Sequence, residues 1–158
     1  MGSSNANLRP DKLCGESCSD DWRQCGHQYQ QQGPEVTLGE YCAVRLSYIL
    51  GQAGMPIPYI LGQTVSGADK RWYFFRVKNL IDFLEQRWGK AEVIRFPPPR
   101  GGNALTNRQG IILFEVSGWS NATGHATLFN GSTCCDQCYF NEPGTNYRTD
   151  RAHFWSLP

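Results

Sequence analysis

The fold of this chain is decided by residues 39–50, which read Gly39-Glu40-Tyr41-Cys42-Ala43-Val44-Arg45-Leu46-Ser47-Tyr48-Ile49-Leu50. Apolar residues recur at 42, 46, 49, 50 and 53, and this spacing predicts an amphipathic helix with a period of 3.6 residues. Gly39 precedes the helix, and Gly51 and Gly54 end it before Pro56. We therefore expect a helix that reaches about Leu50 and carries Cys42 in its first turn.

A cysteine in the first turn of a helix has a particular chemistry. The backbone N–H groups there have no partner within the helix, and the positive end of the helix macrodipole lies beside them. Both favour the thiolate form, which is the nucleophilic form of cysteine. The position therefore indicates that Cys42 is a nucleophile. The alternative is a small buried apolar residue, which is a common role for cysteine outside disulfides.

Length and charge bound the class of protein. We expect residues 1–158 to form a single domain with a substantial core, with residues 1–20 as a loose N-terminal arm. The formal net charge of +1 gives no general attraction to nucleic acid or to an anionic membrane. The longest apolar run, residues 111–114, is too short to cross a bilayer. We therefore expect neither nucleic-acid binding nor membrane insertion.

The seven cysteines suggest an oxidising compartment. If six of them pair, the remaining thiol is Cys42, because three cysteines precede it and three follow it near the end of the chain. The N-terminus lacks the apolar segment of a secretory signal peptide. The chain is therefore expected to leave the cell by a route that reads no signal peptide. The other cysteines are at positions 14, 18, 25, 134, 135 and 138.

Helical patterns come first and strand patterns later. A short helix is expected over Asp21–Gln31, and a strongly amphipathic one over Val77–Trp88, which Gly89 stops. Residues 51–70 are interpreted as a long ordered loop. The order predicts an α+β fold in which N-terminal helices pack on an antiparallel sheet. Residues 110–116 are a continuous apolar run and are therefore expected to form a central strand, and a turn at Asn130-Gly131 closes the strand before it. The expected strands are residues 92–96, 110–116, 124–129 and 152–157.

His125 and Asp136 are candidate partners for the thiol. A thiol nucleophile needs an imidazole to take its proton and later to protonate the leaving amine. His125 opens a strand among small residues, whereas His27 and His153 read as structural. The turn at residues 130–131 would fold the chain back and bring Asp136 beside His125, where it could accept the second N–H of the ring. The alternatives are a hydrogen-bonded core histidine and a solvated turn aspartate.

Metal and redox sites are less consistent with the sequence. Cys135-x-x-Cys138 has a zinc-ligand spacing, but the upstream cysteines are spaced more loosely than in zinc ribbons. No acidic residue follows His125 by two positions, as a zinc deaminase requires. No βαβ pattern surrounds Cys135–Cys138, as a thioredoxin-like site would require. We expect no metal and no cofactor.

Four blocks of sequence together carry a family resemblance. The blocks are Tyr41-Cys42-Ala43-Val44-Arg45-Leu46-Ser47-Tyr48, Ser66-Gly67-Ala68-Asp69, Gly118-Trp119-Ser120-Asn121-Ala122-x-Gly124-His125-x-Thr127-Leu128-x-Asn130-Gly131-Ser132 and Cys134-x-Asp136-Gln137-Cys138. In this order they resemble the fourth family of type VI secretion amidase effectors, which are antibacterial peptidoglycan hydrolases. The likeness runs from about residue 39 to the C-terminus, and the block around His125 is the most specific.

The resemblance implies a compact papain-like fold of the NlpC type and assigns roles to residues. Cys42 matches the family nucleophile, His125 the general base and Asp136 the carboxylate that orients the base. Cys134 and Cys138 match a pair that forms a disulfide in the family. The N-terminal cysteines do not match the family pattern, and their pairing, like that of Cys135, stays open.

The resemblance also implies a substrate, partners and a place of action. The family cleaves the amide between γ-D-glutamate and meso-diaminopimelate in cell-wall stem peptides. Its members pass through a secretion apparatus into the periplasm of a rival bacterium, and the producer carries a cognate immunity protein. This route would explain oxidised cysteines without a signal peptide.

The predicted function is therefore a cysteine amidase that works through a thioester. Residues near the base are expected to line the substrate groove, with two weaker candidates upstream. Two alternatives stay open: a non-catalytic, disulfide-rich secreted binding module, and an acyltransferase or transpeptidase that shares the thioester and differs in the acceptor. The expected groove residues are Trp119, Ser120 and Asn121, followed by Asp69 and Tyr73.

Overall fold

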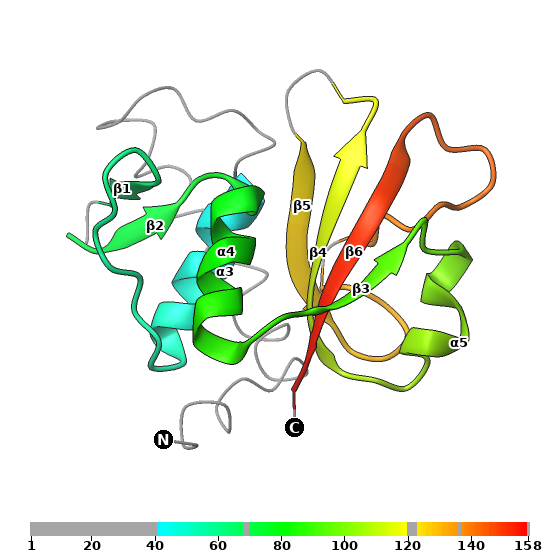
Figure 1. The fold of residues 1–158 in the computed structure, drawn as a ribbon, viewed down its shortest axis with the longest axis horizontal. Coiled ribbons are helices and arrows are strands. Elements are labelled where there is room, and N and C mark those ends of the chain that lie inside the picture. Colours follow the sequence, from blue (N-terminus) through cyan, green and yellow to red (C-terminus); the bar gives the residue numbers. More distant parts are fainter. Residues whose placement is uncertain (1–40, 68–69, 120–122, 136, 158) are drawn as a thin grey trace.

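The structure is a computed structural model that describes residues 41–67, 70–119, 123–135 and 137–157. The expected N-terminal arm, the expected helix over Asp21–Gln31 and the N-terminal cysteines lie outside the described residues. Within the described residues two long helices precede a four-stranded sheet (Figure 1). The predicted α+β fold with an antiparallel sheet is confirmed.

The sheet is antiparallel throughout, with strand order β3-β6-β4-β5. The predicted central strand, β4, is paired on both sides, and its apolar run is almost fully buried. The strand that carries His125, β5, forms one edge of the sheet, where Phe114 of β4 pairs with His125. The strands are β3 (Glu92–Arg95), β4 (Gly110–Ser117), β5 (Gly124–Phe129) and β6 (Arg148–Ser156).

Both helices form where the apolar spacing predicts them. The first, α3, spans Tyr41–Gln52, and the second, α4, spans Val77–Trp88. The apolar stripe of α4 is buried, and Gly89, with a φ of 85°, donates its N–H to the carbonyl of Glu85 at the helix end. A positive φ is accessible to glycine without a steric cost, so Gly89 ends the helix as predicted.

Two apolar clusters hold the sheet in place from its two faces. One joins α3 and α4 to the sheet through residues such as Leu80, Leu113 and Leu128. The other joins the opposite face to the segments around Leu105 and Phe140. Neighbouring residues of β4 therefore belong to different clusters, as the two-residue period of a strand requires. Figure 1 shows α3 and α4 beside β5, on the opposite side of the sheet from α5.

Residues 51–70 are not one loop, which corrects the sequence interpretation. Strand β1 (Thr64–Ser66) pairs antiparallel with β2 (Trp72–Phe74) to form a hairpin. Strands of three residues show no alternation that a sequence pattern could reveal. Two short helical segments, η3 (Pro99–Gly101) and α5 (Gly102–Leu105), were also not predicted, and β6 begins four residues earlier than expected, at Arg148.

The described helices are short. Among the described residues, neither α3 nor α4 nor any other helix has the length and apolar character needed to cross a bilayer.

Candidate active site

Cys42 lies in the first turn of α3, as predicted, and its side chain is 9% exposed. Its sulfur is in no disulfide. The Sγ atom lies 3.9 Å from the carbonyl oxygen of Gly124, the first residue of β5. The start of the helix and the start of the strand therefore meet at this thiol.

The start of β5 depends on a glycine where it packs against β4 and α4. A Cβ atom at Gly124 would lie 2.5 Å from the carbonyl oxygen of Phe114, which is closer than a Cβ atom can approach, and 3.1 Å from a methyl group of Val77, which is a tight contact. A second contact lies one turn along the helix, where Arg45 Nη2 donates to Thr127 Oγ1 at 3.4 Å. Two contacts thus fix α3 against the strand on both sides of His125.

His125 is half-buried and its ring is held by aromatic residues. Tyr139 packs edge-on against the imidazole, with ring centroids 4.8 Å apart. Trp119 and Tyr147 pack in turn on Tyr139, with centroids 4.7 and 5.2 Å away. We call Trp119, Tyr139 and Tyr147 the aromatic cluster. Tyr139 was not singled out by the sequence, because no local pattern distinguishes it from other tyrosines.

Tyr147 anchors the aromatic cluster to the chain that follows it. Its hydroxyl donates to the carbonyl oxygen of Phe140 at 2.9 Å. Burial raises the pKa of Tyr147, and the neighbouring Tyr139 and Glu142 raise it further. The phenol therefore stays protonated over a wide pH range and keeps its donor role. The wall beside His125 is consequently held by a hydrogen bond as well as by ring packing.

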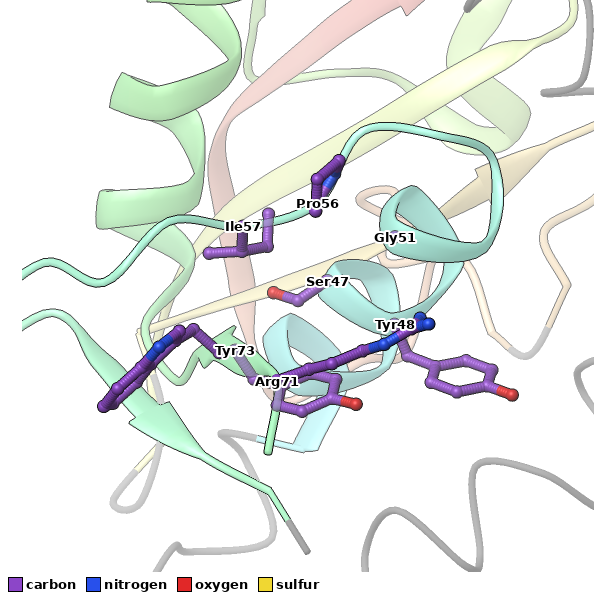
Figure 2. Close-up of a pocket in the computed structure, with 8 residues that line it drawn as sticks. Ser47, Tyr48, Gly51, Pro56, Ile57, Arg71 and Tyr73 are labelled. Carbon is purple, nitrogen blue, oxygen red and sulfur yellow. The ribbon is translucent and has the colours of Figure 1, made fainter. Parts of the chain in front are cut away.

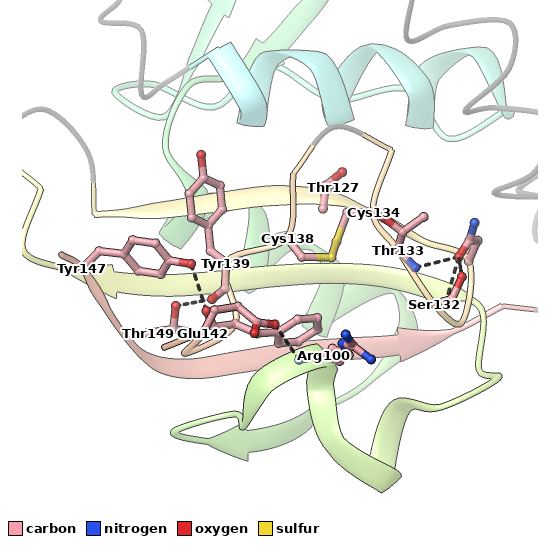
Figure 3. Close-up of a disulfide and its surroundings, with 12 residues drawn as sticks. Arg100, Thr127, Ser132, Thr133, Cys134, Cys138, Tyr139, Glu142, Tyr147 and Thr149 are labelled. Carbon is pink, nitrogen blue, oxygen red and sulfur yellow. Dashed lines mark hydrogen bonds between the residues drawn. A yellow bond between two sulfur atoms is a disulfide. The ribbon is translucent and has the colours of Figure 1, made fainter. Parts of the chain in front are cut away.

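The chain folds back after β5, as the Asn130-Gly131 pair predicts. The side-chain oxygen of Asn130 accepts the backbone N–H groups of Ser132 and Thr133, both at 2.9 Å. The returning chain then pairs with β5, because the Cys135 N–H donates to the Leu128 carbonyl at 3.0 Å. Figure 3 shows this turn beside the disulfide.

The disulfide expected from the family resemblance, Cys134–Cys138, is present, with Cα atoms 5.3 Å apart (Figure 3). Cys135 is also disulfide-bonded. The pairing of Cys14, Cys18 and Cys25 lies outside the described residues.

Of the other predicted site residues, the structure describes Trp119 but not the two aspartates or the residues that follow Trp119. Asp136, Ser120, Asn121 and Asp69 lie outside the described residues. Residues close to Asp136 in the chain lie along β5: the Cys135 N–H donates a hydrogen bond to the Leu128 carbonyl, and the Tyr139 ring packs against His125. Trp119 is half-buried in the aromatic cluster beside the base.

Two further predicted positions lie away from the thiol. Tyr73 is buried against Val44, which faces away from Cys42 on α3, so the structure does not bring Tyr73 to the thiol. His153 is also buried, and its Nε2 lies 2.9 Å from a carboxylate oxygen of Glu115, in keeping with the predicted structural role.

Among the described residues, no group of three or more histidine, cysteine, aspartate or glutamate side chains is arranged to hold a metal ion. The described geometry instead places a thiol in the first turn of a helix, in contact with the residue that precedes His125. This arrangement is suited to nucleophilic attack on a carbonyl group.

Comparison with known families decides the class. The family described as type VI secretion system (T6SS), amidase effector protein 4, matches residues 38–155. The chain belongs to this family. It is therefore an amidase effector of a type VI secretion system, delivered to a target cell, as the resemblance in the sequence implied. No curated protein matches the chain.

Solved structures of the effector Tae4 have the same fold. Tae4 from Salmonella typhimurium, in complex with the immunity protein Tai4 from Enterobacter cloacae, is 32% identical, with 98% of this chain and 97% of that chain covered and a TM-score of 0.71. Tae4 from Enterobacter cloacae is 42% identical over 74% of this chain and 72% of that chain, with a TM-score of 0.64. The Tae4–Tai4 complex from Enterobacter cloacae gives 34% identity, 98% and 92% coverage and a TM-score of 0.67. The predicted papain-like, NlpC-type α+β fold of this amidase effector is thereby confirmed.

The cysteine arrangement of this family member leads to a first prediction. Cys134, Cys135 and Cys138 are disulfide-bonded and Cys42 is not. If six of the seven cysteines pair, thiol titration of the unfolded, unreduced protein should find one thiol per chain. The measurement is reaction with a chromogenic thiol reagent in denaturant, before and after reduction. Three or more thiols before reduction would show that the N-terminal cysteines are reduced, or that a metal has been lost from them.

Proposed function

We propose that the chain is an antibacterial DL-endopeptidase that hydrolyses the amide between γ-D-glutamate and meso-diaminopimelate in peptidoglycan stem peptides. Cys42 is the nucleophile, His125 the general base and Asp136 the orienting carboxylate. The observation that carries the proposal is the contact between the Cys42 sulfur and Gly124, because it places the thiol beside the residue that precedes His125. The family supplies the reaction class, and the residue types supply the mechanism.

The mechanism begins with proton transfer from Cys42 to His125. The thiolate attacks the carbonyl carbon of the γ-D-glutamyl amide and forms a tetrahedral intermediate with a negatively charged oxygen. The backbone N–H of Cys42, in the first turn of α3, is directed to stabilise that oxygen. The imidazolium then protonates the leaving amine of diaminopimelate, which breaks the C–N bond and leaves a thioester. Water, activated by the neutral imidazole, hydrolyses the thioester and regenerates the thiol.

Substrate contacts are assigned to the residues that precede His125. Trp119 belongs to the aromatic cluster that packs beside the base, and Ser120 and Asn121 follow it in the chain. We propose that these three residues line the groove for the stem peptide, with Asp69 as a further candidate. An aromatic wall supplies apolar contact area, and the polar residues supply hydrogen bonds that fix the orientation of the peptide.

The same proposal covers the biological setting. The single domain acts in the periplasm of the target bacterium, which is oxidising and keeps the disulfides formed. A cognate immunity protein protects the producer by binding the effector. Tai4 occupies that role in the solved complexes with Tae4, which supports the proposal for this chain.

The decisive experiment is digestion of purified sacculi, with the released fragments identified by mass spectrometry. Cleavage at the proposed bond gives a new carboxyl group on γ-D-glutamate and a free amine on diaminopimelate. Fragments cut at another amide would contradict the assigned bond. Products carrying a new peptide linkage in place of that carboxylate would identify a transpeptidase, and intact sacculi would favour a binding module.

Asp136 provides a second prediction. Its proposed role is to accept a hydrogen bond from the His125 ring and so hold the tautomer that presents a lone pair to Cys42. Asp136→Asn keeps the size of the side chain but loses the charge, and it can donate to the ring instead of accepting. In a serine triad the equivalent loss is about 10⁴-fold. A thiolate–imidazolium pair tolerates the change better, so we expect turnover of purified muropeptide to fall on the order of 10- to 1,000-fold.

Asp136→Ala serves as the companion variant, and circular dichroism confirms that each protein is folded. Turnover equal to wild type in folded Asp136→Ala would remove this residue from the site and leave a Cys–His dyad or another third group.

A further inference from the structure

The proposed mechanism requires the imidazole ring of His125 to lie in one particular plane. The lone pair of a ring nitrogen lies in the plane of the ring, so the ring takes a proton efficiently only when its plane points at the donor. Rotation about the bond that carries the ring is soft, because the last torsion of histidine has broad wells. The side chain is half-buried, whereas its Nε2 atom is buried, so the folded chain turns this nitrogen inward. Contacts with neighbouring side chains must therefore hold the ring.

The ring of Tyr139 makes such a contact. The centroids of the tyrosine and His125 rings are 4.8 Å apart, and the two planes meet at 68°, which is an edge-to-face arrangement. This arrangement is favourable over a limited range of angles, because the positive edge of one ring meets the negative face of the other. A rotation of the imidazole out of its plane changes the angle and loses the contact. Tyr139 therefore restrains the plane of the imidazole.

The ring of Tyr139 is itself held by other rings. Trp119 packs on it at 84° with centroids 4.7 Å apart, and Tyr147 at 72° with centroids 5.2 Å apart. Phe114 of β4 adds an edge contact at 6.3 Å. A ring with neighbours of this kind has little freedom to turn. The aromatic cluster thus gives Tyr139 the fixed position that a restraint on His125 needs.

The backbone of Tyr139 is fixed as well. The residue before it, Cys138, is in the disulfide with Cys134, and the carbonyl of Tyr139 accepts the hydroxyl of the buried Thr149 (Figure 3). The residue after it, Phe140, is buried in the apolar cluster on the far face of the sheet. The segment is therefore anchored directly before, at and directly after the tyrosine.

We propose that Tyr139 is a positioning residue, whose ring holds the plane of the His125 imidazole so that a ring nitrogen points at the Cys42 thiol. The proposal rests on the proposed function for the roles of Cys42 and His125. It gives Asp136 and Tyr139 separate tasks. The carboxylate selects which nitrogen carries the proton, and the tyrosine ring sets the direction in which the other nitrogen points.

The test follows alkylation of Cys42 by iodoacetamide as a function of pH in wild type, Tyr139→Leu and Tyr139→Phe, each shown to be folded by circular dichroism. Near neutral pH the thiolate depends on the imidazole, so Tyr139→Leu should react about 2- to 10-fold more slowly, the factor that one aromatic pair is worth. At about pH 10 an ordinary thiol is ionised without help, so the three proteins should react alike. Tyr139→Phe keeps the ring and should follow wild type at every pH.

The kinetic constants for purified muropeptide give a second readout. A misdirected base slows proton transfer without changing substrate contacts, so kcat of Tyr139→Leu should fall by about the same factor while KM stays within about twofold. Tyr139→Phe should again match wild type. A raised KM with unchanged kcat would assign Tyr139 to substrate binding and overturn the proposal.

Tyr48→Leu is the matched control. Tyr48 is also a half-buried tyrosine, and it lies on α3 itself, about 120° around the helix from Cys42. There it lines a cavity of about 300 Å³ together with Ser47 and Gly51 (Figure 2). The change removes the same ring from the helix that carries the thiol, away from His125, so the alkylation profile and kcat should match wild type. An equal loss in Tyr48→Leu and Tyr139→Leu would attribute both to a loosened fold and overturn the proposal.

Two further outcomes of the alkylation experiment would also overturn it. One is equal alkylation of folded Tyr139→Leu and wild type near neutral pH. The other is a loss in Tyr139→Phe as large as that in Tyr139→Leu, which would assign the effect to the hydroxyl group instead of the ring. Alkylation needs no turnover, so intact sacculi would contradict the proposed function and leave this comparison decisive.

Discussion

Replacement of Cys42 by alanine is expected to lower turnover of purified muropeptide on the order of 10⁴- to 10⁶-fold, because no other group can form the thioester. The change removes one sulfur atom from the start of α3, at a side chain that is 9% exposed. The sulfur lies at the long distance of 3.9 Å from the Gly124 carbonyl oxygen, which is a weak contact. We therefore expect a folded protein without activity. The measurement is the rate of muropeptide cleavage, with circular dichroism to confirm the fold.

Cys42→Ser is the matched control, because it keeps the size of the side chain and replaces the thiol with a weak nucleophile. It should also be inactive, and both variants should still bind a protecting immunity protein. Muropeptide cleavage at the wild-type rate by folded Cys42→Ala would exclude covalent catalysis at this residue. In that case the thiol would be a buried apolar group, as the alternative interpretation of the sequence has it.

The helices and the central strand could be predicted because their burial is periodic along the chain. The stripe of Val77, Leu80, Ile81 and Leu84 is what makes α4 amphipathic, and Gly89 ends it by adopting a positive φ. These are properties of single residues at a fixed spacing, so a sequence pattern contains them. The continuous apolar run of β4 likewise indicates burial on both faces, and both apolar clusters contain its residues.

The β1–β2 hairpin and the start of β6 could not be predicted, because contacts distant in the sequence specify them. Strand β2 is held by Ser47 of α3, which accepts the Phe74 N–H. At the start of β6, the buried Thr149 donates its N–H to the side chain of Asn141 at 2.9 Å, and Arg148 is exposed. Polar residues in a strand carry no apolar period, so the pattern begins only at Ala152.

The candidate site likewise contains residues that the sequence could predict and residues that it could not. Cys42 stands out because a helix start changes the chemistry of a thiol, and His125 because it opens a strand among small residues. The Cys134–Cys138 disulfide came from the family resemblance, since seven cysteines allow many pairings. Tyr139 acts through a ring contact with His125 that only the folded chain creates.

Replacement of His125 by alanine is expected to lower muropeptide turnover on the order of 10³- to 10⁵-fold, since the thiol loses both its base and the acid for the leaving amine. The same variant should slow alkylation of Cys42 by iodoacetamide at neutral pH, because an adjacent imidazolium stabilises the thiolate and the thiolate is the reacting form. The two readouts report different steps. Turnover needs proton transfer in both directions, whereas alkylation needs only the thiolate. Alkylation at Cys42 is measured by mass spectrometry of the peptide that contains it.

His153→Gln is the matched control, because His153 is the other described histidine and its contact is with Glu115 on the strands. Glutamine keeps a donor for that carboxylate, so turnover and alkylation should match wild type once folding is confirmed. Equal alkylation rates at Cys42 in wild type and folded His125→Ala would break the pairing of thiol and imidazole. A large loss of turnover with unchanged alkylation would assign His125 to the protonation of the leaving amine alone, with the thiolate held by the start of α3. A fall in both turnover and alkylation would indicate that the imidazole lies beside the thiol. The contact between Cys42 and Gly124 supports this arrangement.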